Sequence, residues 1–236
     1  MPEISPEKIS NWIKTKVKNS KTKGIVLGLS GGIDSSVVSV LCKNAVGRKN
    51  LLCLILPCET SKKDIQDAKL VAKKFKLKTK TVDLTNIYRN LLKILPPANK
   101  IAKANLKPRL RMLTLYYFAN KHNYLVVGTG NKSEIMMGYF TKYGDGGVDI
   151  LPIGDLLKKD VLQLAKKLKI PERIINKEPS AGLWPGQTDE KEMGITYKML
   201  DKLLEGKLKN SKIKNIIKMT EHKRKPPEIF KMTGGN

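Results

Sequence analysis

The sequence has few acidic, aromatic and cysteine residues, and it has no long hydrophobic run. Aromatic residues make up 6% of the 236 residues, and the cysteines are Cys42, Cys53 and Cys58. They form neither a Cys-x-x-Cys pair nor a zinc-binding pattern, so we expect reduced, buried thiols. No apolar run is long enough to span a bilayer, and the N-terminus lacks the apolar core of a signal peptide. These absences predict a cytoplasmic protein without a membrane partner.

The charge of the chain is strongly one-sided. There are 46 Lys and Arg against 21 Asp and Glu, which gives a formal net charge of +25. Such an excess is typical of nucleic-acid-binding proteins. The lysines, however, are spread along the whole chain, with no long basic tail and no interleaved aromatic residues. We therefore expect solvated basic helix faces and no nucleic-acid partner, with a positive field that attracts small polyanions such as nucleotides.

Strand-like and helix-like segments alternate along the chain. The length and a hydrophobic content of 40% fit one globular core. We expect a single domain over 1–236, in which 205–236 is a basic C-terminal helical arm. Strands are expected at 24–29, 51–56, 79–82 and 124–127, and helices at 9–17, 64–75, 103–120, 155–168 and 190–204. This order predicts an α/β fold with a doubly wound parallel sheet flanked by helices.

A glycine-rich loop joins the first strand to a helix. It reads Gly28-Leu29-Ser30-Gly31-Gly32-Ile33-Asp34-Ser35-Ser36. Glycines let the backbone approach a ligand closely, and the free amides at a helix N-terminus favour a phosphate. The loop lacks the Gly-Lys-Ser/Thr ending of a P-loop and carries Asp34 instead, which is placed to hold a metal ion beside phosphates.

Further polar clusters lie where a purely structural chain would have simple turns. One follows a later strand and reads Gly128-Thr129-Gly130-Asn131-Lys132-Ser133-Glu134. Because ligands of doubly wound sheets bind at the carboxyl ends of the strands, this loop and the loop at Gly28 are expected to form one site. The other clusters lie at 105–112, 139–149, 179–190 and 221–224. For each cluster taken alone, a turn, a helix cap or a solvated surface is the favoured interpretation.

Together and in order, these clusters resemble the ammonia-dependent NAD synthetases over 24–227. The string Ser-Gly-Gly-x-Asp-Ser alone is similar to the pyrophosphate loop of the ATP pyrophosphatase superfamily. More specific strings follow it, namely Thr141-Lys142-Tyr143-Gly144-Asp145-Gly146-Gly147-Val148-Asp149, Pro185-Gly186-Gln187-Thr188-Asp189-Glu190 and Glu221-His222-Lys223-Arg224. The resemblance implies an adenine-nucleotide alpha-hydrolase-like fold. It also implies a ligase that adenylates deamido-NAD with ATP, releases pyrophosphate, and forms NAD and AMP when ammonia attacks.

The resemblance also implies a role for individual residues. Asp34 and Glu134 would hold Mg²⁺, and Asp34, Asp145 and Lys158 would act in catalysis, with Asp145 a candidate for handling ammonia or its proton. ATP would be bound by Gly28, Leu29, Ser30, Gly31, Gly32, Ile33, Asp34, Ser35, Thr129, Lys158 and Ser180. Deamido-NAD would be bound by Arg109, Lys142, Asp149, His222 and Lys223.

The chain departs from the family pattern at a few positions. Pro108 stands where the family usually has alanine, which leaves open whether Arg109 or Arg111 meets the substrate. Ser180 replaces a more usual threonine and keeps the hydroxyl. Only 23 residues precede the first strand, too few for a glutaminase domain, so we expect the chain to use free ammonia or a separate ammonia-supplying subunit. The family also implies a homodimer, to which Trp12, Ile13 and the 103–120 helix could contribute.

Two other functions fit parts of the sequence. An enzyme with the same loop could adenylate transfer RNA or another carboxylic acid, with the charge of +25 serving RNA. The spacing of Cys53 and Cys58 counts against the sulfur-transferring members of that group, which use paired cysteines. A nucleotide-binding regulator without catalytic activity is the third possibility, but it has no need of two carboxylates at metal positions.

Overall fold

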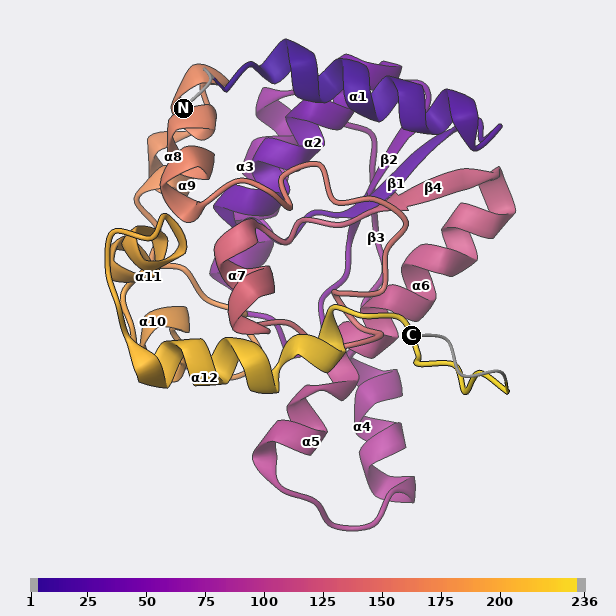
Figure 1. The fold of residues 1–236 in the computed structure, drawn as a ribbon. Helices are drawn as coiled ribbons and strands as arrows, with labels where there is room; N and C mark the ends of the chain where they lie inside the picture. The colour runs from indigo at the N-terminus through magenta and orange to yellow at the C-terminus, as the bar shows by residue number, and fades with distance from the viewer. Residues whose placement is uncertain (1–3, 233–236) are drawn as a thin grey trace.

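A parallel sheet of four strands lies at the centre of the protein (Figure 1). The computed structural model describes residues 4–232. The strand order is β3-β2-β1-β4, with every neighbouring pair parallel. The strands are β1 (Gly24–Gly28), β2 (Leu51–Ile55), β3 (Thr79–Thr81) and β4 (Tyr124–Val127). This arrangement confirms the predicted doubly wound fold, and the direction of winding reverses between β1 and β4.

Helices bury both faces of the sheet because alternate side chains of each strand point to opposite sides. Ile25 and Leu27 of β1 belong to one apolar cluster, and Val26 belongs to the other. The first cluster contains α1 (Pro6–Asn19), α2 (Ile33–Val46), α3 (Lys62–Lys74), α8 (Lys158–Lys167) and α9 (Glu172–Ile175). The second contains α4 (Thr85–Ile94) and α6 (Leu106–His122). The sheet is therefore the middle layer of three.

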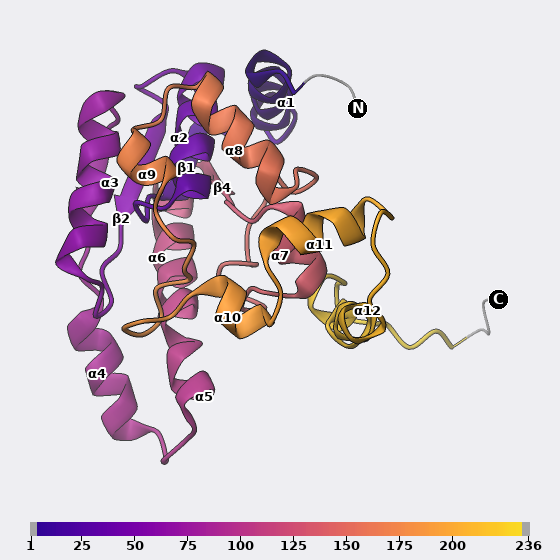
Figure 2. The same cartoon turned by 90° about the vertical axis from the view of Figure 1, so that its left-hand side faces the viewer.

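A third apolar cluster lies beside the sheet. It joins α7 (Lys132–Met137), α10 (Asp189–Met193), α11 (Tyr197–Leu204) and α12 (Ser211–Met219). Figure 2 shows α7 next to both α11 and α12. The short 3₁₀ turn η1 (Glu221–Lys223) follows α12. In this way the C-terminal part of the chain packs against the helix that follows β4, within reach of the carboxyl end of the sheet.

The prediction of one continuous helix over 103–120 is wrong. Two helices meet at Asn105, namely α5 (Lys100–Ala104) and α6. Pro108 explains the break, because it has no amide hydrogen to bond to the carbonyl of Ala104 and is tolerated only in the first turn of a helix. Together α4 and α5 project away from the body of the molecule in both views (Figures 1 and 2).

The helix predicted over 190–204 is also divided. Gly194 is left-handed with φ +67° and ends α10, and Thr196 then caps α11 by accepting from the amide of Met199. The helix predicted at 155 begins instead at Lys158, and α4, α7 and α9 were not predicted. Among residues 4–232, no helix has both the length and the apolar content that crossing a bilayer requires.

Candidate functional site

A cavity of about 860 Å³ opens at the carboxyl ends of β1 and β4, where the winding reverses. Most of the predicted site residues line it: Gly28, Leu29, Ser30, Gly32, Ile33, Asp34, Ser35, Thr129, Glu134, Asp145, Lys158, Ser180 and Lys223. Gly31, Arg109, Lys142, Asp149 and His222 are not among the residues that line it. The loops after β1 and β4 therefore do meet at one site, as the sequence predicted.

The loop after β1 is held in shape by its own serines. Ser35 Oγ accepts from the amide of Ser30 at 3.2 Å and lies 3.0 Å from Ser30 Oγ. Ser30 Oγ in turn accepts from the amide of Gly32 at 3.2 Å. Gly32 is the N-cap of α2 and has no side chain to bond the amides of the first turn. Those amides are therefore available to an anion at the positive end of the helix dipole.

Gly31 is a position that only glycine fits. Its φ is +82°, and a Cβ built there would lie 2.5 Å from the carbonyl oxygen of Asp64 and 2.8 Å from the amide nitrogen of Ala68. Both atoms belong to α3, so the loop and the N-terminal part of that helix are in direct contact. The glycine predicted for ligand approach thus also allows this helix to pack against the loop.

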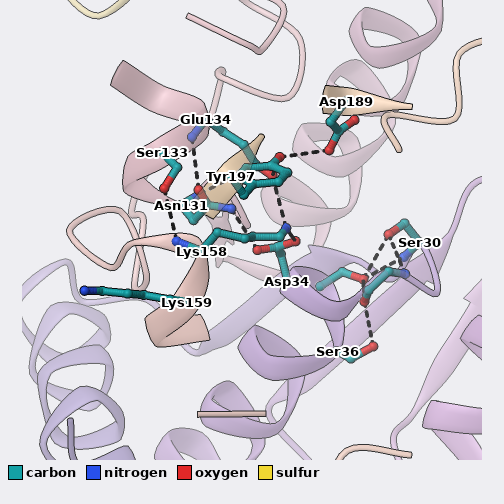
Figure 3. Close-up of polar contacts among 12 residues, drawn as sticks. Ser30, Asp34, Ser36, Asn131, Ser133, Glu134, Lys158, Lys159, Asp189 and Tyr197 are labelled. Carbon is teal, nitrogen blue, oxygen red and sulfur yellow. Dashed lines mark hydrogen bonds and ion pairs between the residues drawn. The ribbon is translucent and has the colours of Figure 1, made fainter. Parts of the chain in front are cut away.

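Four side chains from three elements converge on one another beside this loop (Figure 3). Lys158 Nζ donates to Asp34 Oδ2 at 2.6 Å and lies 3.5 Å from Glu134 Oε1. Asn131 Nδ2 donates to Asp34 Oδ1 at 2.9 Å, and the amide of Asn131 donates to Glu134 Oε2 at 3.2 Å. The side chain of Lys158 is only 4% exposed, while each of the two carboxylates is 17% exposed. The lysine ammonium thus lies between the two carboxylates predicted to bind metal.

The electrostatics of this group follow from burial and from the like charges. Burial, together with repulsion by Asp34, raises the pKa of Glu134 to about 8. Burial alone would lower the pKa of Lys158, but Asp34 and Glu134 outweigh it and raise that pKa. The group therefore holds a charged lysine and a carboxyl whose proton is easily exchanged near neutral pH.

Local structure fixes the position of each of these residues. Asn131 and Glu134 form a capping box at the start of α7, in which each side chain accepts from the other's backbone amide. Ser133 Oγ accepts from the amide of Lys158 at 3.1 Å and donates to Asp201 Oδ1 at 2.6 Å. The start of α8 is therefore tied to the start of α7 and to the buried Asp201 of α11.

Asp189 and Tyr197 extend the group on the far side of Lys158 (Figure 3). The Tyr197 hydroxyl donates to Asp189 Oδ2 at 2.9 Å and lies 3.4 Å from Glu134 Oε1, and the Lys158 ammonium lies 5.0 Å from the centre of the tyrosine ring. Burial raises the pKa of Asp189, although Tyr197 and Lys158 oppose the shift. Asp189 lies within the predicted 185–190 string, whereas nothing in the sequence pointed to Tyr197.

Asp145 also lines the cavity and lies in a tight turn. Its Oδ1 accepts from the amide of Thr141 at 2.9 Å. Desolvation raises the pKa of Asp145, while this backbone bond and the cations Arg111 and Lys223 favour its charged form. Of the two arginines considered, Arg111 lines the cavity, and its Nε donates to the carbonyl of Leu56 at 3.2 Å. Arg109 is exposed and donates to the carbonyl of Lys142 at 3.3 Å.

The predicted deamido-NAD ligands divide into two groups. Lys142 Nζ donates to the carbonyl of His222 at 2.6 Å, so Arg109, Lys142 and His222 form one chain of contacts. Lys223 Nζ bonds the carbonyls of Gly138 and Phe140 at 2.7 and 3.0 Å and reaches the cavity. These cations gather where η1 meets the turn at 138–145.

Asp149 lies apart from that group. Its Oδ2 accepts from the amide of Val126 in β4 at 2.7 Å, and its Oδ1 accepts from the hydroxyl of Tyr116 at 2.9 Å. The aspartate therefore completes the hydrogen bonding of the edge strand, and its predicted substrate role remains a prediction.

A loop at 179–187 covers part of the cavity and is tied to its walls. Ser180 Oγ accepts from the amide of Gly182 at 3.1 Å. The buried Lys107 donates to the carbonyl of Leu183 at 2.9 Å and lies 3.1 Å from Glu59 Oε2. Lys100 lies 4.1 Å from the centre of the Trp184 ring. No sequence pattern predicted these contacts, because they join residues that are far apart in the chain.

Within residues 4–232, no group of three or more His, Cys, Asp or Glu side chains is placed to hold a metal ion. Asp34 and Glu134 nevertheless supply carboxylate oxygens, which are the ligands that Mg²⁺ prefers. Mg²⁺ is usually bound by one or two carboxylates together with substrate phosphates, and the phosphate-type loop lies directly beside this pair. The residues therefore fit a magnesium ion that is completed by a bound nucleotide.

Comparisons with known proteins agree with this geometry. A family model described as NAD synthase matches residues 5–227. The NH(3)-dependent NAD(+) synthetase of Archaeoglobus fulgidus is 48% identical over 236 residues, which cover 96% of each chain. A solved structure of NMN synthetase from Francisella tularensis matches with a TM-score of 0.89 at 39% identity, over 96% of this chain and 99% of that one. The NH3-dependent NAD synthetase from Campylobacter jejuni matches with a TM-score of 0.81 at 34% identity, over 96% and 97%.

Proposed function

This chain belongs to the NAD synthase family, and from that membership we propose that it is an ammonia-dependent NAD synthetase. It is a ligase that uses ATP to convert the nicotinate carboxylate of deamido-NAD into the amide of NAD. The observation that carries the proposal is the convergence of Asp34, Glu134 and Lys158 beside free helix amides at the carboxyl end of the sheet. This set of groups suits the phosphates of ATP, and curated relatives with the same activity in their names are matched over nearly their whole length.

The first half of the reaction activates the acid. A carboxylate oxygen of deamido-NAD attacks the α-phosphorus of ATP, the bond from that phosphorus to the bridging oxygen breaks, and pyrophosphate leaves. Two anions must approach each other, so positive groups have to surround the phosphates. We propose that the first-turn amides of α2, at Ile33, Asp34 and Ser35, and the ammonium of Lys158 supply this positive charge.

Asp34 and Glu134 would hold Mg²⁺ together with oxygens of the ATP phosphates. When bound, the ion would neutralise phosphate charge and favour departure of pyrophosphate. In the structure described here, the ammonium of Lys158 is paired with both of these carboxyl groups. Thr129 and Ser180 line the same cavity and are proposed to contact ATP as well.

The second half of the reaction forms the amide. The nitrogen of ammonia attacks the carbonyl carbon of the adenylate, AMP leaves, and the nitrogen loses a proton. Asp145 is proposed to receive that proton or to bind the incoming ammonium, because it lines the cavity and its desolvated position raises its pKa. Arg109, Lys142, Asp149, His222 and Lys223 are proposed to bind deamido-NAD, and the cations among them gather near η1.

A second acid substrate is supported by the likeness to the Francisella tularensis NMN synthetase. The acid to be activated would then be the mononucleotide rather than the dinucleotide. The two substrates differ only in the adenylate half, which would lie among the cations near η1. Comparing kcat/KM for deamido-NAD and for nicotinate mononucleotide separates the two substrates.

We also propose a cytoplasmic homodimer. All three cysteines are free and buried, as suits a reducing compartment. Apolar side chains are exposed on α4, α5 and α6, namely Ile87, Ile94, Ile101, Leu113 and Tyr117. Ile13 belongs to the core, whereas Trp12 is partly exposed on α1. Sedimentation of the wild type and of Leu113→Glu with Tyr117→Glu tests the dimer, which should dissociate in the double variant.

The function is tested by supplying the pure protein with ATP, magnesium and deamido-NAD, and with either an ammonium salt or glutamine. Mass spectrometry should find NAD, AMP and pyrophosphate in equal amounts with ammonium. Efficient NAD formation from glutamine alone contradicts the proposed nitrogen source. Absence of NAD with either nitrogen source contradicts the proposed function.

A further inference from the structure

We propose that Lys177 is a positioning residue for the ATP-dependent half of the reaction. It would fix the glycine-rich loop at 28–36, called the phosphate loop below, against α3. The inference deepens the proposed function and rests on the use of ATP at this site. Lys177 follows α9 at the beginning of the segment that leads into the 179–187 loop. No role for this lysine was predicted from the sequence.

The ammonium of Lys177 touches two separate elements. It lies 2.5 Å from Asp64 Oδ1 and 2.9 Å from Asp67 Oδ2, both in the N-terminal half of α3. It also donates to the carbonyl oxygen of Gly31, in the phosphate loop, at 3.5 Å. One side chain thus joins α3, the phosphate loop and the base of the covering loop.

Burial of Asp67 holds these contacts between α3 and the segment after α9 in place. Asp67 is fully buried, and its other carboxylate oxygen lies 2.8 Å from Arg173 Nε. A buried carboxylate has to be paired, because an unpaired one is costly to remove from water. Two acids and two bases therefore form a neutral cluster that holds the segment after α9 on α3.

The contact between α3 and Gly31 links the position of Lys177 and its acidic partners to the position of the phosphate loop. A Cβ on Gly31 would lie 2.5 Å from the carbonyl of Asp64 and 2.9 Å from Cβ of Asp67, so the loop rests directly on the residues that pair with Lys177. Interiors packed this closely transmit displacements. If Asp64 and Asp67 shift, Gly31 shifts with them, and so do the amides at the N-terminus of α2 that follow it.

Lys177 lines the cavity, so a direct bond from its ammonium to phosphate is the competing role, whereas its contacts with α3 and Gly31 support positioning. The two roles differ in what they predict for Asp67. Asp67 is fully buried and does not line the cavity, so it cannot touch ATP. A positioning role requires that neutralising Asp67 weakens ATP use. A direct bond from Lys177 to phosphate predicts that Asp67→Asn leaves ATP use unchanged or improves it, because it frees the lysine.

The experiment measures deamido-NAD-dependent pyrophosphate release by the full-length wild type and by Lys177→Met, Lys177→Arg and Asp67→Asn. We expect Lys177→Met and Asp67→Asn to raise the KM for ATP about tenfold or more, since small displacements of positioned groups have effects of this size. The KM for deamido-NAD should stay within about twofold, because the contacts of Lys177 are with Gly31, Asp64 and Asp67 and with none of the proposed deamido-NAD ligands. Lys177→Arg, which keeps the charge, should recover part of the loss.

Lys69→Met on the exposed face of the same helix is the matched control and should behave as wild type. An unchanged KM for ATP in Lys177→Met, or in Asp67→Asn, overturns the inference. So does a loss of thermal stability without any change in the ratio of the two KM values. If a Met or Asn variant does not fold, Lys177→Arg and Asp64→Asn carry the same test, with a raised KM for ATP again required. Failure of the proposed function is a separate result, since the wild type would then release no pyrophosphate with deamido-NAD.

Discussion

Asp34 is the side chain on which the candidate site depends most. It was expected to bind metal because it stands in a phosphate-type loop in place of the lysine of a P-loop. In the structure, both of its oxygens are engaged, one by Asn131 and the other by Lys158. Lys158 is 124 residues away in the chain. No spacing rule could have paired the two residues, and only the family resemblance brought Lys158 into the predicted site.

Asp34→Asn should nearly abolish adenylation. The amide keeps the shape of the side chain but removes the negative charge that would hold a cation against the phosphates. Groups of this kind contribute about a hundredfold or more to the rate. The measurement is deamido-NAD-dependent pyrophosphate release at saturating ATP and magnesium. Asp155→Asn, an exposed aspartate paired with Lys132, is the control, and a near-wild-type rate for Asp34→Asn contradicts the metal role.

The raised pKa of Glu134 predicts how the folding stability of the ligand-free protein depends on pH. Its pKa is raised from 4.5 to about 8 in the folded protein. The folded state therefore binds this proton more tightly than the unfolded state, so its stabilising effect is present below pH 4.5 and is lost as the pH rises through about 8. The Tm of the wild type should fall across this window relative to that of Glu134→Gln, which cannot lose a proton. Parallel Tm curves for the two proteins contradict the assignment.

Among the helices and loops, periodicity predicted those that pack on the sheet and missed those that depend on distant partners. The strands and α1, α2, α3 and α8 follow from their apolar patterns, because the apolar side chains of each belong to buried clusters. The breaks at Asn105 and Gly194 were missed although Pro108 and Gly194 signal them. The short α7 was missed because its cap, Asn131 with Glu134, was interpreted only as part of a binding loop.

Gly31→Ala tests the packing of the phosphate loop on α3. The positive φ and the approach to the Asp64 carbonyl should together cost about 1–3 kcal/mol of folding stability and raise the KM for ATP. Gly47→Ala has a similar φ of +74° but no atom within 4 Å of the added Cβ. It serves as the control for strain without a clash. Equal losses of stability in the two variants would show that the contact with α3 has no effect of its own.

Lys107→Met tests whether the contacts of Lys107 hold the 179–187 loop in place. The change removes the hydrogen bond to the Leu183 carbonyl and the ion pair with Glu59. We expect faster hydrogen exchange over 180–186 and a higher KM for ATP, with little change in exchange in β1 and β2. Lys103→Met, an exposed lysine in α5, is the control. Unaltered exchange over 180–186 would mean that other contacts hold the loop.

The molecule as a whole places its chemistry where doubly wound sheets place their ligands, at the point where winding reverses. The reversal between β1 and β4 brings the loops at Gly28 and Gly128 together. This meeting was predictable because both loops follow strands of a doubly wound sheet. The covering loop, α11 and η1 come from the last quarter of the chain. Of these, α11 is held by the third apolar cluster, whose members are far apart in the chain, so that no local pattern reveals it. A net charge of +25 favours the approach of anionic substrates to the molecule.

The central claim is that ATP activates the nicotinate carboxylate as an adenylate. It is tested most directly with deamido-NAD that carries a heavy oxygen isotope in that carboxylate. The carboxylate oxygen that attacks the α-phosphorus stays on AMP when ammonia displaces it, so mass spectrometry should find the label in the phosphate of AMP. Label found in inorganic phosphate, with ADP as the nucleotide product, would contradict the account.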